Sequence, residues 1–420
     1  EDIIVNGNEY YSDEEILKFN NSEPNEYIWS DTLSRDLRWI NSYPYRQVDV
    51  IFKPGENPGY TDVIYETKDM NPARIFGGID NYGSPTTNEH QAYLGFSYGD
   101  LWDLDHEVIY SFGSSLDFAN FNSHTLQYIV PFDWRHRLSL TGNISTSKPE
   151  ATGLISQEGT NMTLNVDYEM PLYDWGFRGF TQAVNIGTDY KRLENDLEFG
   201  GINVFSGAPE ILQHYVTYEG TRASAKTVDT LRATLIGSLG GITGNNTDAD
   251  FNTSRVNADS SYTYGRGLYE KRYTDPTTNL TFSALFRGQY SPDQLLSSEQ
   301  IALSGPGSVR GFDSNAVRRD IGYVGTLEVA SPYIPVIDYF LSDIFRDRLQ
   351  GFVFYDRAEG KNVTDSTTAR NGVILQSIGL GARFGISNNI NGVVEYGREL
   401  GDEFDDGPDD RVHFRLNAAY

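Results

Sequence analysis

Hydrophobic and polar residues alternate along many segments of the chain beyond residue 74. The clearest examples are 137–144, 162–170, 280–290 and 380–386, where apolar side chains occupy every second position. Alternation with a period of two places one set of side chains on each face of an extended chain, so it predicts β-strands with one apolar and one polar face. Turn-rich stretches separate these segments as far as the C-terminus.

The repeated segments predict sixteen antiparallel strands. The predicted strands cover residues 74–82, 90–98, 106–116, 123–132, 136–148, 159–171, 178–193, 210–222, 228–239, 279–291, 298–304, 321–333, 348–359, 373–386, 391–400 and 411–420. An even number of strands returns the chain to the side at which the first strand begins. The predicted fold class is therefore mainly β, with a sixteen-stranded transmembrane antiparallel β-barrel.

Alternation alone also fits a soluble β-sandwich, in which the apolar face points into a core and not towards lipid. The end of the chain favours a membrane barrel. Apolar positions in the last predicted strand run to an aromatic residue at the C-terminus, as is common in outer-membrane barrels. Three of them form a candidate C-terminal barrel signal: Phe414, Leu416 and Tyr420.

Connections between the predicted strands are short on one side and long on the other. Short ones lie at 133–135 and 387–389, and long ones at 194–209, 239–278 and 305–320. Short periplasmic turns and long external loops produce this pattern in outer-membrane barrels. Aromatic residues also gather near strand ends, where they suit the edges of a bilayer. They include Trp102, Trp134, Tyr173 and Trp175.

Residues 1–69 follow a different pattern. Ser12 and Glu15 form a capping box at the start of a short helix, and an apolar face along 29–41 predicts a second helix. The three predicted strands cover residues 2–5, 48–52 and 63–65. The predicted order β-α-α-β-β describes a small α+β domain that precedes a barrel at 70–420.

Composition excludes several classes of protein. A length of 420 residues suits one large barrel with a small additional domain. No apolar run approaches the roughly 18 residues of a transmembrane helix. A net charge of −26 argues against a nucleic-acid partner, and the absence of cysteine excludes disulfides and thiolate metal sites. No P-loop, Gly-x-Ser-x-Gly elbow or nucleophile beside a base occurs, so we predict neither enzyme activity nor a cofactor.

The candidate chemistry lies in an arginine and an aspartate. Arg310 stands between the glycines of the predicted loop 305–320, and Asp356 lies on a predicted strand. A buried charge without a partner is costly, and guanidinium and carboxylate groups pair through two hydrogen bonds. Inside a narrow barrel lumen Arg310 would need a carboxylate, and we predict that its partner is Asp356. A solvated arginine on a surface loop is the alternative.

The segments around these two residues resemble the loop signature and the wall motif of the BamA/TpsB superfamily, which inserts or secretes proteins at the outer membrane. In that superfamily the loop, here 305–320, folds back into the barrel lumen, and its arginine pairs with the aspartate of a Phe-x-Asp-x-Gly strand. Phe354 and Asp356 match this barrel-wall motif, and Ala358 stands where glycine is usual. The resemblance implies a loop lock formed by Val309, Arg310, Gly311, Phe312 and Asp356.

Further segments resemble the haemolysin and haemagglutinin transporter branch of this superfamily, the two-partner secretion (TpsB) transporters. They are 37–41, 44–46, 54–62, 80–84, 101–106 and 128–136. By this resemblance, residues 1–69 are a periplasmic POTRA domain, with a generic α+β domain as the alternative. Only one such domain is recognisable, whereas the branch usually has two and a plug helix. Because no signal-peptide pattern follows Glu1, we interpret the chain as mature or shortened.

The resemblance implies a monomeric transporter in the outer membrane of a Gram-negative bacterium, surrounded by outer-membrane lipid. It would bind an unfolded exoprotein at the POTRA domain and pass it outwards through the lumen, without a nucleic acid, metal or cofactor. An insertase of the same superfamily is the main alternative. A passive porin is a more distant one.

Two groups of residues were weighed as metal sites. The acidic segment 402–410 could bind calcium, but its spacing is not that of an EF-hand loop, and a solvated loop is the favoured interpretation. Asp103, Asp105 and His106 lie at a predicted turn without further histidines, so no zinc site is predicted.

Overall fold

The computed structural model describes residues 2–150, 155–173, 179–199, 202–336, 347–363, 371–387, 389–401 and 410–420. The chain divides into two compact units. The first contains Glu1–Arg74, Phe96–Ile109 and Tyr128–Leu138, and the second contains Ile75–Gly95, Tyr110–Gln127 and Ser139–Tyr420. Every helix in the described part of the chain is too short or too polar to cross a membrane.

The N-terminal part of the first unit is a small α+β fold. Its elements are β1 (Ile3–Asn6), α1 (Asp13–Leu17), α2 (Ser30–Ile40), β2 (Arg46–Pro54) and β3 (Thr61–Asp69). The sheet order is β1-β3-β2, with β1 parallel and β2 antiparallel to β3. The predicted order of elements is confirmed, as is the capping box, in which Ser12 Oγ accepts from the Glu15 amide and the Glu15 carboxylate accepts from the Ser12 amide.

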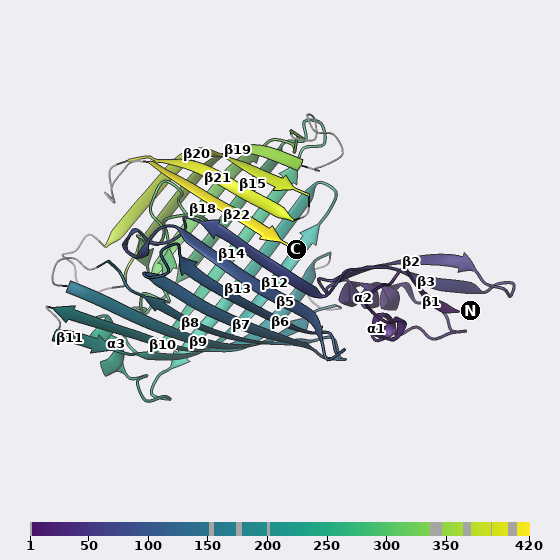
Figure 1. The fold of residues 1–420 in the computed structure, drawn as a ribbon, viewed down its shortest axis with the longest axis horizontal. Coiled ribbons are helices and arrows are strands. Elements are labelled where there is room, and N and C mark those ends of the chain that lie inside the picture. The colour runs from purple at the N-terminus through teal and green to yellow at the C-terminus, as the bar shows by residue number, and fades with distance from the viewer. Residues whose placement is uncertain are drawn as a thin grey trace. The chain divides into compact units, whose positions relative to one another are not determined.

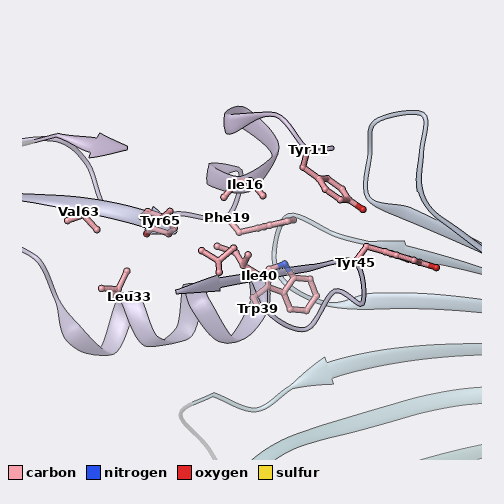
Figure 2. Packing of buried hydrophobic residues seen from close by; sticks show 10 residues of the cluster. Tyr11, Ile16, Phe19, Leu33, Trp39, Ile40, Tyr45, Val63 and Tyr65 are labelled. Carbon is pink, nitrogen blue, oxygen red and sulfur yellow. The ribbon is translucent and has the colours of Figure 1, made fainter. Parts of the chain in front are cut away.

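Figure 2 shows the hydrophobic core of this α+β fold, formed between the two helices and the sheet. Trp39 and Ile40 from α2 meet Ile16 from α1 and Tyr65 from β3, and all four are fully or almost fully buried. Three aromatic rings add edge and face contacts, because Phe19 lies 5.8 Å from Trp39 and 6.1 Å from Tyr43 between ring centroids. The apolar side chains of this α+β fold therefore lie in its interior, away from solvent.

Buried ion pairs connect the segments of the first unit. Arg46 at the start of β2 contacts Asp105 at 2.7 Å, and both side chains are buried. Asp36 on α2 is buried and pairs with Arg135. Asp105, one of the residues considered as a metal ligand, therefore has an arginine as its partner. Among the described residues no group of three or more His, Cys, Asp or Glu side chains could hold a metal ion.

The described residues from Ala73 onwards include sixteen strands that close into an antiparallel barrel (Figure 1). They are β4 (Ala73–Asp80), β5 (Gln91–Leu101), β6 (His106–Ser115), β7 (Phe121–Pro131), β8 (Arg137–Ser147), β9 (Ile155–Pro171), β10 (Thr181–Phe199), β12 (Glu210–Ala223), β13 (Thr227–Leu239), β14 (Ser261–Thr274), β15 (Thr281–Tyr290), β18 (Ile321–Ala330), β19 (Asp347–Lys361), β20 (Gly372–Ile386), β21 (Ile390–Glu399) and β22 (Asp410–Ala419). A short strand, β11 (Ile202–Gly207), pairs with the end of β10. The barrel closes where β22 pairs with β4.

The predicted strands differ from the structure in two places. Strand β14 was missed and assigned to a long loop, 239–278, because its outward positions include Gly265, Gly267 and Lys271 and form no apolar face. Conversely, 298–304 is not a wall strand. Only Ile301–Ala302 (β16) is extended, and it pairs with Arg318–Arg319 (β17) inside the connection from β15 to β18. The two errors cancel, so the strand number remains sixteen among the described residues.

The polarity of the side chains on the two faces of the wall strands indicates the environment on each side of the wall. Outward side chains such as Phe286 on β15 and Leu380 on β20 are 53% and 59% exposed. Inward side chains such as Gln289, Ser377 and Asp356 are polar and buried. An apolar exterior around a polar interior is the arrangement of a transmembrane barrel and the reverse of a soluble sandwich. The prediction of a membrane barrel is confirmed.

Some predicted features fall on residues that the structure does not describe. Of the aromatic residues expected near the membrane edges, Trp102 and Trp134 are exposed, whereas Trp175 lies outside the described residues. Most of the acidic segment, 402–409, and Asn388 in the predicted turn 387–389 also lie outside them.

Candidate functional site

The connection from β15 to β18 returns into the barrel and packs against the inner wall. Val309 and Phe312 are almost completely buried in one cluster with Val324 of β18, Ala358 of β19 and Leu375 of β20. The tip turns sharply at two glycines with positive φ, Gly305 at 96° and Gly307 at 73°. Glycine adopts this backbone conformation without the steric cost that other residues meet.

The tip of this loop places Arg310 against Asp356. The Arg310 Nε donates to Asp356 Oδ2 at 2.8 Å and its Nη2 donates to Oδ1 at 2.9 Å. The Arg310 backbone amide donates to the same carboxylate at 3.2 Å. Arg310 is 5% exposed and Asp356 is fully buried. Two parallel charge-assisted hydrogen bonds fix both the position and the orientation of the loop tip.

Two further carboxylates complete the site, and sequence reasoning missed both. Arg310 Nη1 donates to Glu395 on β21 at 2.7 Å and lies 3.6 Å from Glu328 on β18. Glu328 also receives two hydrogen bonds from Arg383 on β20, at 2.6 and 2.8 Å. Two arginines therefore face three carboxylates. Burial alone would lower the pKa of Arg310, but Asp356 and Glu395 outweigh it and the pKa is raised, so the guanidinium stays charged.

An aromatic ring forms the floor of the site. The Arg310 guanidinium carbon lies 3.3 Å from the centroid of the Phe354 ring, a cation–π contact. Gly379 on the neighbouring strand makes room for this ring, because a Cβ at that position would lie 2.3 Å from it. Ala358 belongs to the same buried cluster as Val309 and Phe312, so its methyl group is accommodated where the superfamily usually has glycine.

The last two strands hold the backbone of the loop tip. His413 Nε2 on β22 donates to the Arg310 carbonyl at 3.0 Å, and a Cβ on Gly397 of β21 would lie 2.6 Å from that carbonyl oxygen. Arg411 on β22 donates to both oxygens of Asp313, at 2.6 and 3.0 Å. The tip thus contacts β18, β19, β20, β21 and β22, the last five wall strands in the described part of the chain.

Two buried carboxylates hold the base of the loop. Glu299 accepts from Lys191 on β10 and from the Tyr264 hydroxyl on β14, both at 2.8 Å. Although burial raises the pKa of Glu299, Lys191 and the hydrogen bonds lower it below its ordinary value, so the group is ionised. At the other end, Asp320 accepts from both Nη atoms of Arg255, which follows α3 (Asp248–Ser254), at 2.5 and 2.6 Å.

The candidate C-terminal signal lies on β22 and beside the closure of the barrel. Leu416 is registered with Ile79 of β4, and the backbone of Tyr420 exchanges two 2.8 Å hydrogen bonds with Ile75. Phe414 is registered with Val394 of β21. In the described residues this closure consists of five registered pairs, whereas the preceding contact of β21 with β22 has nine.

Sequence comparison gives two matches. Residues 59–384, more than half of the chain, match the family of haemolysin secretion/activation proteins ShlB/FhaC/HecB. The outer membrane transporter CdiB of Dickeya dadantii (strain 3937) is 25% identical over 319 residues, which are 67% of this chain and 50% of that protein. The chain thus spans about half the length of the curated relative that it matches.

Similar folds occur in solved structures. CdiB from Escherichia coli has a TM-score of 0.81 at 17% identity, with 100% of this chain and 76% of that chain covered. CdiB from Acinetobacter baumannii has 0.74 at 16%, covering 100% and 73%. BamA from Haemophilus ducreyi lacking POTRA domains 1–3 has 0.63 at 11%, covering 100% and 84%. At these identities the likeness shows a shared fold. Together with the sequence match, these findings show that the chain is an outer-membrane β-barrel and belongs to the haemolysin secretion/activation protein family ShlB/FhaC/HecB.

Proposed function

We propose that this chain is a two-partner secretion transporter, which moves an unfolded exoprotein from the periplasm through the barrel to the outside. The observation that carries the proposal is the loop held inside the barrel, whose buried Arg310 contacts three carboxylates. Membership of a secretion family and likeness to the outer membrane transporter CdiB support it. The barrel closes on itself through β22 and β4, which supports a monomer embedded in outer-membrane lipid.

We assign residues 1–69 to a periplasmic POTRA domain that binds the exoprotein, and residues 70–420 to the barrel. In the described three-stranded sheet, β3 is central and β2 forms a nine-residue edge. Ile51 and Phe52 on this strand are exposed apolar side chains. An extended peptide can add to such an edge through main-chain hydrogen bonds, with side-chain contacts giving selectivity.

The role assigned to the loop lock is to keep the tip in a defined position in the lumen. Removal of one partner from a buried ion pair leaves the other charge without compensation, at a cost of about 3–5 kcal/mol. The lock residues Val309, Arg310, Gly311, Phe312 and Asp356 therefore act as one unit, with Phe354 as the floor. Since the sequence has no ATP-binding motif, folding of the exoprotein outside the cell is the proposed driving force.

The test is deletion of the gene in its host, followed by complementation with the wild-type gene. The proteomes of the culture supernatant and of the outer membrane are compared. Secretion predicts the loss of one large exoprotein from the supernatant, its return on complementation, and unchanged outer-membrane barrels. Retention of every exoprotein in the supernatant of the deletion strain would contradict the proposal.

An insertase for other barrels is the second candidate. The fold likeness to BamA and the short closure of five registered pairs between β22 and β4 favour it, because an insertase of this superfamily opens the seam between its first and last strands. The same experiment separates the two functions, since an insertase predicts general depletion of outer-membrane barrels without selective loss of one exoprotein.

A further inference from the structure

A second group of arginines lines the lumen at a distance from the loop lock. Arg232, Arg266, Arg287 and Arg318 surround a cavity of about 660 Å³ between the inner wall of β12–β15 and the base of the inward loop. Asp189 is the carboxylate that lines this cavity among the described residues. The cavity is thus lined by four positive charges and one negative charge, whereas the whole chain has a net charge of −26.

Three of these arginines bond to neutral oxygens. Arg266 donates to the Gln289 side chain at 2.7 Å, Arg287 to the Ala302 carbonyl at 3.1 Å and the Ser308 hydroxyl, and Arg318 to the Ser297 carbonyl at 3.1 Å. Within the described ranges none of the three forms an ion pair with a carboxylate, whereas Arg232 pairs with Glu219 at 2.9 Å. Asp189 accepts from Asn165 and Gln213 and compensates none of them.

One of these guanidinium groups has an unused donor. Arg287 Nε is buried and has no hydrogen-bond partner among the described residues. A buried charged donor without a partner is destabilising, so an oxygen anion that reached it would be bound favourably. The arrangement contrasts with Arg310, whose guanidinium is paired with the carboxylates of Asp356 and Glu395.

We propose that this cavity binds carboxylate side chains of a polypeptide that passes through the lumen. The inference rests on the proposed secretion function and deepens it by naming a feature of the cargo. Arginine forks match planar carboxylates through paired hydrogen bonds. The amide and hydroxyl groups that also line the cavity can bond to the backbone of an extended peptide. They belong to Asn165, Thr217, Thr234, Gln300 and Asn315.

The test is calorimetric titration of the folded chain in detergent with a soluble peptide of alternating glycine and glutamate, and with its glutamine counterpart. The glutamate peptide is expected to bind at least about tenfold more tightly, since one charge-assisted contact corresponds to a factor of that order. Arg318→Gln and Arg287→Gln are each expected to weaken its binding about tenfold. Arg272→Gln is the matched control, because Arg272 lies on β14, outside this cavity, and already pairs with Glu270 at 2.6 Å.

Arg287→Gln could loosen the loop. Arg318→Gln then still tests the proposal, because within the described residues the Arg318 side chain donates a single hydrogen bond, to the Ser297 carbonyl. Equal binding of the two peptides, or unchanged binding in both arginine variants, would overturn the proposal. So would binding of inorganic phosphate without binding of the glutamate peptide, which would indicate a site for free anions. Arginine-dependent peptide binding together with normal secretion in the deletion strain would leave the site standing and refute the secretion function.

Discussion

The α+β fold at the N-terminus and the strands of the barrel differ in where their apolar side chains point. Those of the first point into its interior, and those of the second point mostly outwards. Ile16, Trp39 and Ile40 lie inside the first, whereas Phe286 and Leu380 of the barrel point outwards and inward wall positions such as Gln289, Ser377 and Asp356 are polar. The comparison teaches that alternation separates the two faces of a strand but does not show whether the apolar face meets a protein core or lipid. The structure decides this question, because in the barrel the polar face is the one that points inwards.

The largest effect is expected in the α+β core. Trp39→Ala should destabilise this fold by about 3–5 kcal/mol, since it removes a fully buried aromatic side chain. Hydrogen exchange of the amides in α2, measured by mass spectrometry on the whole chain, would show the loss. Trp29→Ala is the control, because Trp29 is exposed at the N-cap of the same helix and its removal should change exchange little.

A smaller effect is expected on the outward face of the barrel. Leu380→Arg should destabilise the barrel by about 2–4 kcal/mol, because it places a charge in lipid. Urea unfolding in lipid bilayers measures the change, with Leu380→Val as the control of similar shape and polarity. An exposed leucine on a soluble protein tolerates arginine. If the Leu380→Arg variant were as stable as the Leu380→Val control, the outward face of the barrel would not be in contact with lipid, which would contradict this comparison.

The smallest effect concerns Asp69, which caps the turn between β1 and α1. Its carboxylate accepts from the amides of Glu9, Tyr10 and Tyr11, at 2.9–3.1 Å. Burial raises the pKa of Asp69, but these hydrogen bonds outweigh it and the pKa is lowered. The folded-state pKa thus lies below the unfolded one, so the contribution to stability is present above the ordinary pKa and is lost as pH falls through the folded value.

Asp69→Asn should therefore cost about 1 kcal/mol at neutral pH and much less in acid. Hydrogen exchange of residues 9–11 at two pH values would measure both. Asp49→Asn, on β2 of the same sheet, is the control for the charge change. An equal cost for Asp69→Asn at both pH values would show that the carboxylate charge has no part in this turn.

The sequence was sufficient to predict the barrel, but the strand number agreed only because the missed strand β14 offset the segment 298–304, which is not a wall strand. Arg310 and Asp356, which were predicted as partners, lie together in the structure. Clean alternation in β20 gave its faces, while the glycines and Lys271 on the outward side of β14 concealed that strand. Glu328 and Glu395 were not recognised as partners of Arg310, because a carboxylate on an inward position looks like any other polar residue until the strands are brought into register.

The cavity arginines were concealed for a related reason. Arg266 and Arg287 come from adjacent wall strands, and Arg318 from the base of the loop, so only the closed barrel and the inward course of the loop bring them together. Neither proximity nor the lack of a carboxylate partner can be read from spacing along the chain.

The most direct test of the loop lock is secretion by the Arg310→Ala and Asp356→Ala variants, measured as exoprotein in the culture supernatant. Each variant should lower secretion at least about tenfold while the barrel still folds, as shown by its heat-dependent migration in gels, because a stranded charge costs about 3–5 kcal/mol. Arg222→Gln, on the outward face of β12, is the control. Normal secretion by both lock variants, with folded barrels, would contradict a role for the Arg310–Asp356 pair in transport.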